Sequence, residues 1–233
     1  MVIFKYILMI TLLLVLMACN SPVKEAPKVS SQLNIIQKPI IYDAKREELS
    51  LEYLSTRYNM KMDKAQITPK MVVVHWTAIP TLEASFNAFY KPMLPSFRSK
   101  ISSASQLNVS AHYLIDRDGT IYQLLPNTTF ARHVIGLNHS AIGIENVGNG
   151  SNLPLTAEQL TANIELIKQL SKAYPIEYVI GHHEYRNFSK HPLWKEVNPN
   201  YLTVKTDPGE TFMTNIRASL TDLNLKKVPE LKQ

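Results

Sequence analysis

The chain has 233 residues, of which 45% are hydrophobic and 19% are charged, so it is expected to fold rather than to be disordered. A single cysteine excludes a disulfide framework, and a formal charge of +6 favours an acidic partner such as anionic lipid or an acidic polymer. Nucleic acid is not expected as a partner. The basic residues are scattered, and the sequence has neither zinc-finger spacing nor a glycine-rich phosphate loop.

The N-terminal segment has the pattern of an export signal. Lys5 precedes an apolar run over residues 6–18, which is shorter than the roughly 20 residues that a membrane span needs. The run ends in "LMAC", which resembles a bacterial lipobox, where the cysteine is lipidated and becomes the mature N-terminus. We therefore expect a lipoprotein signal peptide over residues 1–18 and a lipid anchor on Cys19. An ordinary signal peptide that happens to contain a cysteine is the alternative.

The residues after Cys19 predict a linker and one domain. Asn20 follows the cysteine. In lipoproteins of Gram-negative bacteria an aspartate there often means retention in the inner membrane, so asparagine favours the outer membrane, with the protein facing the periplasm. Polar residues without periodicity predict a flexible tether over residues 19–37. A single catalytic-size domain over residues 38–216 and a C-terminal tail over residues 217–233 follow, and a monomer is expected.

The first half of the domain is expected to contain two helices and a hairpin. Residues 43–59 carry leucines and tyrosines at helical spacing, residues 71–76 are a strand, and residues 82–90 are a second helix. "AHYLI" and "TIYQLL" then alternate as strands on either side of the turn "DRDG", whose Gly119 can take a positive φ. The segment "AIGIENV" is a further short strand.

The second half adds a helix, a strand and a long loop. Thr156 and Gln159 form a capping box, and Pro175 ends the helix that follows. The strand "IEYVIG" leads into an irregular segment, in which the aromatic residues indicate order. Because long loops in compact domains are usually functional, we expect residues 185–204 to form one wall of a cleft. Strands interleaved with helices predict an α/β domain with a mixed central β-sheet flanked by helices.

The histidines are the main candidates for a site. Most lie at ends of predicted strands or in loops, where scaffolds present catalytic groups, although each alone is more often structural. Two imidazoles and a carboxylate, from Asp207 or Glu145, would leave the fourth position of a tetrahedral zinc open for water. The HExxH motif is absent, because Asn187 stands where its second histidine is required. A metal site must therefore be assembled from distant segments. The seven histidines are His75, His112, His133, His139, His182, His183 and His191.

Four segments of the chain match one family in their order and separation. They are "VVVHWTA", then "SAHYLIDRDGTIYQLL" with "ARHVIGLNHSAIGIENVG", then "VIGHHEY", then "KTDPG". Together they resemble the zinc-dependent N-acetylmuramoyl-L-alanine amidases, which include phage-type amidase lysozymes and the peptidoglycan recognition proteins. The match runs from about residue 40 to residue 212. It implies the single-domain α/β fold of that family.

The resemblance implies one zinc ion with three protein ligands. His75, His182 and Asp207 match the ligand positions, so the buried strand before His75 would carry an imidazole to the metal. His183 is the less expected ligand, because successive strand residues point to opposite faces of a sheet.

The resemblance also implies roles for residues around the metal. Glu145 matches a catalytic glutamate, and Lys205 matches a lysine that stabilises the tetrahedral intermediate. His133 matches a histidine of the substrate cleft, while Asn138 shapes the cleft wall and Trp76 is a further substrate-binding candidate.

Two departures from the family qualify this assignment. Phage-type members carry a tyrosine where this chain has Ala111, which gives Glu145 more weight as the proton carrier. The segment between Glu184 and Lys205 is longer than in short members of the family. His112 and His139 are expected to be structural.

The implied reaction is hydrolysis of the amide between N-acetylmuramic acid and L-alanine of the peptidoglycan stem peptide. That substrate carries many carboxylates, which suits a basic protein. Two alternatives stay open. One is a catalytically silent recognition module, in which a zinc ligand is commonly replaced. The other is a recycling amidase acting on anhydro-muropeptides, and the export signal opposes its cytoplasmic location but not its substrate.

Overall fold

The structure is a computed structural model that describes residues 33–96 and 102–231. The expected signal peptide, Cys19 and most of the expected tether lie outside these residues. In the part of the chain that is described, no helix is both long and apolar enough to cross a membrane.

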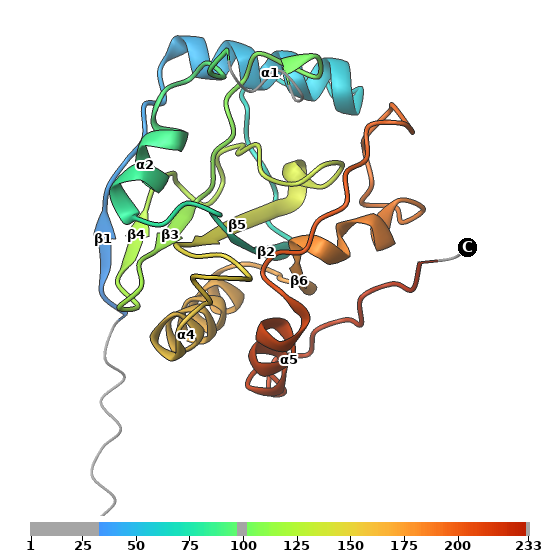
Figure 1. The fold of residues 1–233 in the computed structure, drawn as a ribbon. Coiled ribbons are helices and arrows are strands. Elements are labelled where there is room, and N and C mark those ends of the chain that lie inside the picture. The colour runs from blue at the N-terminus through green and yellow to red at the C-terminus, as the bar shows by residue number, and fades with distance from the viewer. Residues whose placement is uncertain (1–32, 97–101, 232–233) are drawn as a thin grey trace, which may run out of the picture. The chain divides into compact units, whose positions relative to one another are not determined.

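One mixed sheet forms the centre of the described domain (Figure 1). Strands β3 and β4 pair antiparallel, which confirms the predicted hairpin, and every other neighbouring pair is parallel. The central strands are buried over almost their whole length, as expected for parallel strands covered on both faces. In spatial order the strands are β1 (Ile35–Gln37), β4 (Ile121–Gln123), β3 (Tyr113–Ile115), β5 (Ala141–Asn146), β2 (Met71–Trp76) and β6 (Tyr178–Gly181).

Side chains cap the N-termini of most of the described α-helices. Asp43 accepts a hydrogen bond from the backbone N–H of Arg46, and Thr156 and Gln159 form the predicted capping box. The guanidinium of Arg46 is buried and donates to the carbonyls of Phe89, Tyr90 and Lys91, so the first helix holds the C-terminal end of the second. The helices are α1 (Ala44–Tyr58), α2 (Leu82–Tyr90), α4 (Ala157–Ala173) and α5 (Glu210–Ala218), with 3₁₀-helices η1 (Asn138–Ser140) and η2 (His182–Phe188).

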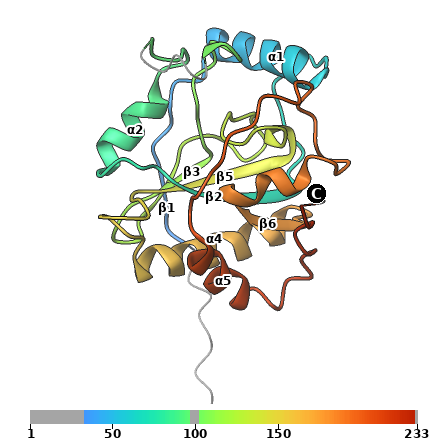
Figure 2. The same ribbon diagram turned by 45° about the vertical axis from the view of Figure 1, so that its right-hand side comes forward.

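The alternation of side chains along β2 separates two cores. Val72 and Val74 belong to the cluster that contains apolar residues of α4 and α5, which lie side by side on one face of the sheet (Figures 1 and 2). Met71 and Val73 belong to the cluster on the other face, with residues of η2. Because side chains alternate, His75 continues the second row, whereas Trp76 continues the first.

Two expectations need correction. The expected tether ran to residue 37, but Ile35–Gln37 is strand β1 and pairs with β4. A three-residue strand is too short to show a periodic pattern, so the sequence did not reveal it. The start of the long segment was expected to be irregular, but His182–Phe188 forms η2, whose buried residues include Tyr185 and Phe188.

Candidate metal centre

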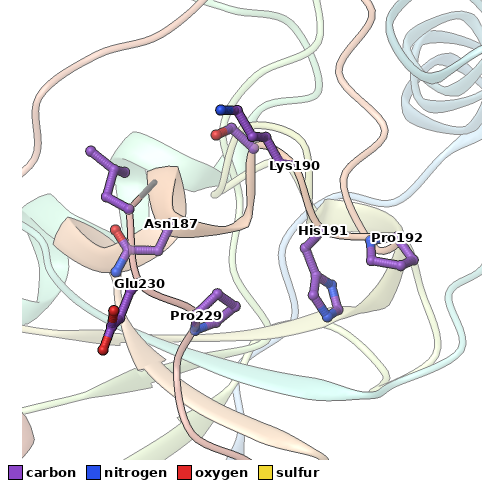
Figure 3. A pocket seen from close by; sticks show the side chains of 8 residues that line it. Asn187, Lys190, His191, Pro192, Pro229 and Glu230 are labelled. Carbon is purple, nitrogen blue, oxygen red and sulfur yellow. The ribbon is translucent and has the colours of Figure 1, made fainter. Parts of the chain in front are cut away.

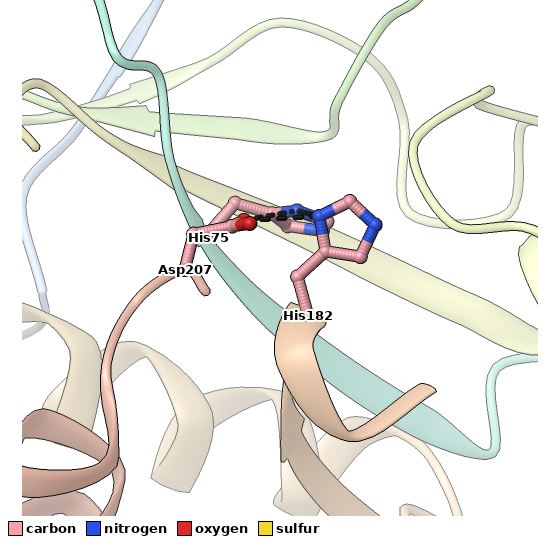
Figure 4. A group of neighbouring side chains, drawn as sticks. All are labelled: His75, His182 and Asp207. Carbon is pink, nitrogen blue, oxygen red and sulfur yellow. Dashed lines mark hydrogen bonds and ion pairs between the residues drawn. The ribbon is translucent and has the colours of Figure 1, made fainter. Parts of the chain in front are cut away.

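Three side chains from distant segments converge at one end of the sheet (Figure 4). His75 stands near the end of β2, His182 is the first residue of η2 after β6, and Asp207 follows the long loop. Nδ1 of His75 lies 2.9 Å from Nδ1 of His182 and 3.3 Å from Oδ2 of Asp207, and the remaining pair is 2.9 Å apart. All three residues are buried, with exposures of 1%, 7% and 8%.

Burial and close contacts shift the pKa values of two members of the trio, His182 and Asp207. Burial lowers the pKa of His182 to about 4, with a further contribution from neighbouring His75. Burial alone would raise the pKa of Asp207, but its contacts with the imidazoles of His182 and His75 outweigh this effect and hold the pKa well below its usual range. At neutral pH the trio therefore offers a carboxylate and an imidazole that does not carry a charge. Metal binding requires ligands in these states.

The donor atoms fit a small divalent cation. Ligands of a tetrahedral zinc stand at about 2.0–2.2 Å from the metal and so about 3.3 Å from one another, close to the spacing of this trio. Holding three lone-pair-bearing atoms together out of water costs free energy unless a proton or a cation shares them. His75, His182 and Asp207 could therefore hold a metal ion.

His133 fixes the orientation of His75 through Nε2, the ring nitrogen of His75 that does not face the other two residues of the trio. Nε2 of His133 lies 3.2 Å from the carbonyl oxygen of Ala141, and its Nδ1 lies 3.0 Å from Nε2 of His75. A carbonyl only accepts, so Nε2 of neutral His133 carries the hydrogen and its Nδ1 accepts from Nε2 of His75. This arrangement leaves the lone pair on Nδ1 of His75 directed at the other two donors, and such a partner usually sets the tautomer of a metal ligand.

A glycine provides the room for that contact. A Cβ built on Gly143 of β5 would lie 2.8 Å from the ring of His133, closer than real Cβ contacts allow. The absence of a side chain here therefore lets the imidazole lie flat against the strand.

Glu145 and Lys205 lie in the same cavity as the trio. Glu145 is the register partner of His75 on the neighbouring strand β5, and it is 9% exposed. Together with Trp76, these two residues and the trio line a cavity of about 330 Å³. The structure thus brings together a carboxylate, an ammonium group and a candidate metal site.

The comparisons with known proteins identify the family. Residues 65–210, more than half of the chain, match the family described as Amidase_2, N-acetylmuramoyl-L-alanine amidase. The chain belongs to this amidase family. The resemblance seen in the sequence is thereby confirmed. No curated protein matched the chain.

Solved structures show the same fold. The N-acetylmuramoyl-L-alanine amidase LysC from Clostridium intestinale is 22% identical with a TM-score of 0.51, over 83% of this chain and 99% of that one. Bumblebee PGRP-SA is 19% identical with a TM-score of 0.51, over 84% of this chain and 99% of that one. The predicted α/β class with a mixed central sheet is confirmed.

His183 lies outside the trio of this amidase. Its Nδ1 is 3.0 Å from the carbonyl oxygen of Asp207 and its Nε2 is 3.1 Å from Glu210. The expected choice of His182 over His183 agrees with this geometry. The reason given for it, the alternation of side chains along a strand, was wrong. Both residues belong to a 3₁₀-helix, in which successive side chains diverge because each turn holds three residues.

Asn138 and His112 brace the backbone around the cavity. Oδ1 of Asn138 accepts from the N–H groups of His133 and Val134, and its Nδ2 donates to the hydroxyl of Tyr58. His112 is completely buried, with Nδ1 accepting from Gly143 N–H and Nε2 donating to the carbonyl of Thr129. Asn138 therefore fixes the backbone at His133 and Val134, and His112 links β5 to the segment around Thr129.

The long loop is tied to the body of the domain, and its residues Tyr201 and Thr203 line a smaller cavity rather than the metal-centre cavity. The hydroxyl of Tyr185 bonds to both the N–H and the carbonyl of Thr203. Arg57 of α1 lies 2.7 Å from the carboxylate of Glu196 and covers the ring of Tyr201 at 4.4 Å. These contacts hold the loop against η2 and α1.

Sequence reasoning missed Arg132. This residue is 4% exposed and lines the metal-centre cavity beside His133. Its position next to a candidate histidine was the one available signal.

Another pocket, of about 290 Å³, lies between residues 187–192 and the C-terminal segment (Figure 3). It contains His191, the seventh candidate histidine. Both ring nitrogens of His191 have partners, the hydroxyl of Tyr178 and the N–H of Leu193. His191 is therefore assigned a structural role.

Proposed function

We propose that this protein is a zinc-dependent peptidoglycan hydrolase that cleaves the amide between N-acetylmuramic acid and L-alanine of the stem peptide. The observation that carries the proposal is the buried trio of His75, His182 and Asp207 in one cavity with Glu145 and Lys205. A catalytically silent recognition module would not need all three candidate metal ligands together with Glu145 and Lys205.

His75, His182 and Asp207 would hold the zinc ion. When bound, zinc lowers the pKa of a water to about 7 and polarises a carbonyl. The chain supplies the remaining requirements. His133 keeps the lone pair of His75 directed at the metal, and burial keeps competing water away.

Glu145 and Lys205 would handle protons and charge. Glu145 takes a proton from the attacking water and returns it to the leaving amine, which makes the peptide a better leaving group. Lys205 offsets the negative charge that grows on the carbonyl oxygen, an effect typically worth about 3 kcal/mol. Both groups line the cavity that contains the trio, within reach of one substrate.

Metal content and amide hydrolysis, measured together, test this proposal. The wild-type protein should bind one zinc ion and release peptide from a muramoyl-dipeptide. His182→Ala should lose zinc and activity, whereas the matched control His183→Ala should keep most of both. Loss of zinc in the His183 variant alone would show that the ligand assignment is wrong.

The same proposal includes a location. Peptidoglycan lies outside the cytoplasm, and the sequence pattern around Cys19 supports export and lipid anchoring, with the outer membrane favoured by Asn20. Cys19→Ser should move the protein from the membrane fraction to the soluble fraction. Unchanged membrane association of that variant would contradict the anchor.

A further inference from the structure

A smaller cavity opens beside the metal centre. Its volume is about 100 Å³, and it is lined by Tyr201 and Thr203 of the long loop together with residues of the larger cavity. We call it the Arg132 pocket. The residues that it shares with the larger cavity are Val109, Arg132, His133, His182 and Lys205.

The Arg132 pocket has a positive lining. Arg132 and Lys205 both face it, and among the described residues no aspartate or glutamate lines it. Glu196, the carboxylate of the same loop, is bound by Arg57 and lies outside the lining. An anionic group that enters the pocket therefore meets two cations, and the nearest loop carboxylate is already neutralised.

The guanidinium of Arg132 is held rigidly for such a contact. It donates to the carbonyl oxygens of Ser105 and Leu107, and it lies 3.3 Å from the hydroxyl of Tyr201. These neutral oxygens fix the orientation of the group. A cation that is already fixed loses less side-chain entropy when it binds an anion, and arginine pairs with carboxylates in a planar, bidentate geometry.

The sizes of the spaces around the metal centre indicate which part of a substrate lies where. The Arg132 pocket has room for about three water molecules, which suits a carboxylate and its carbon but not a sugar ring. Trp76 belongs to the metal-centre cavity and to a separate open groove of about 510 Å³ near the start of α4 and α5. The flat indole and the larger space suit the glycan. The peptide then extends towards Arg132.

We propose, resting on the amidase function above, that the Arg132 pocket binds a free carboxylate of the stem peptide. The residue after the alanine has its α-carboxyl group roughly two residue lengths, about 7 Å, from the bond that is cleaved. The pocket thus selects stem peptides in which this group is a carboxylate over those in which it is an amide.

Two muramoyl-dipeptides that differ only at this group test the proposal. We expect the wild-type enzyme to have a kcat/KM about 10- to 100-fold higher for the acid than for the amide, the usual effect of one charge-assisted hydrogen bond. Arg132→Met should reduce this preference, and Arg132→Lys should restore part of it. Equal kcat/KM values for the two substrates with the wild-type enzyme would overturn the subsite.

A binding measurement covers the case in which the Arg132 variants fail to fold or neither substrate is cleaved. Calorimetry with wild-type protein and the two free dipeptides should show tighter binding of the acid. If neither muramoyl-dipeptide is hydrolysed but the acid binds more tightly, the amidase proposal fails and the subsite stands. If both are hydrolysed and the dipeptides bind equally, the subsite alone fails.

Discussion

We expect the residues around the trio to have separate roles in metal binding and in catalysis. Glu145 allows the proton-transfer role to be tested apart from metal binding. It is the register partner of His75 but not a member of the trio. Glu145→Gln should therefore keep zinc and substrate affinity while kcat falls about 10²–10⁴-fold, the usual value of general acid–base catalysis. Steady-state kinetics and metal analysis on the same preparation check this. A near-normal kcat in this variant would show that a group other than Glu145 transfers the proton.

His133 is expected to act on the metal through His75. His133→Ala removes the acceptor for Nε2 of His75 and should weaken zinc binding about 10- to 100-fold, as is usual for such second partners. His133→Asn places an amide oxygen near the position of Nδ1 and should recover part of the affinity. Competition with a chelator measures both, independently of activity.

Gly143→Ala provides a second test of the contact between His133 and His75. The added methyl group would push the ring of His133 away from β5, so zinc affinity should fall although no polar group has been removed. Zinc affinity equal to that of the wild type in both Gly143→Ala and His133→Ala would contradict the positioning role.

Whole helices and strands were easier to predict from the sequence than the contacts between them. The hairpin, the apolar strand before His75 and the capping box at Thr156 follow from local patterns, and the structure confirms them. Strand β1 and helix η2 are too short to carry a periodicity, and they are fixed by tertiary pairing and packing.

The candidate metal centre shows the same contrast between features that the sequence predicts and contacts that depend on packing. The identities of His75, His182 and Asp207 came from motifs recognised in order, and the structure brings these residues together. The contact between His133 and His75, the space at Gly143 and the pocket at Arg132 depend on how separate segments pack. A single sequence does not contain that information.

The ion pair between Arg57 and Glu196 anchors the long loop. Its loss should affect the site although neither residue lines the metal-centre cavity. The side chain of Glu196 is fully buried and that of Arg57 is 13% exposed, so Arg57→Met leaves a buried carboxylate with the N–H of Asn198 but without its cation. Such a change typically costs about 3–5 kcal/mol. Limited proteolysis should then cut between residues 189 and 204 faster than in the wild type, and activity should fall with the loop. A loop that is equally resistant in the variant would show that other contacts hold it.

The folded molecule as a whole should lose stability in mild acid. Burial lowers the pKa of His112 to about 4, and burial with nearby Lys195 lowers that of His139 to about 4. In the unfolded chain these residues titrate near 6.5, so the unfolded state binds more protons between pH 6.5 and pH 4. Stability is therefore fully present above about pH 6.5 and declines as the pH falls to 4.

Urea unfolding of the metal-free protein at pH 7 and pH 5 measures this decline. His112 alone should contribute on the order of 3 kcal/mol over the full range. In His112→Gln the difference between the two pH values should shrink. A difference as large as that of the wild type would show that other groups cause it.

Mass spectrometry of the products from intact peptidoglycan tests the central claim most directly. Zinc-loaded protein incubated with purified sacculi should release stem peptides that begin with a free alanine amino group and leave glycan strands unbroken, while Glu145→Gln should release far less. The same spectra distinguish intact from anhydro-muropeptide substrates. Binding to sacculi without release of such peptides by the zinc-loaded wild-type protein would contradict the account and identify a recognition module.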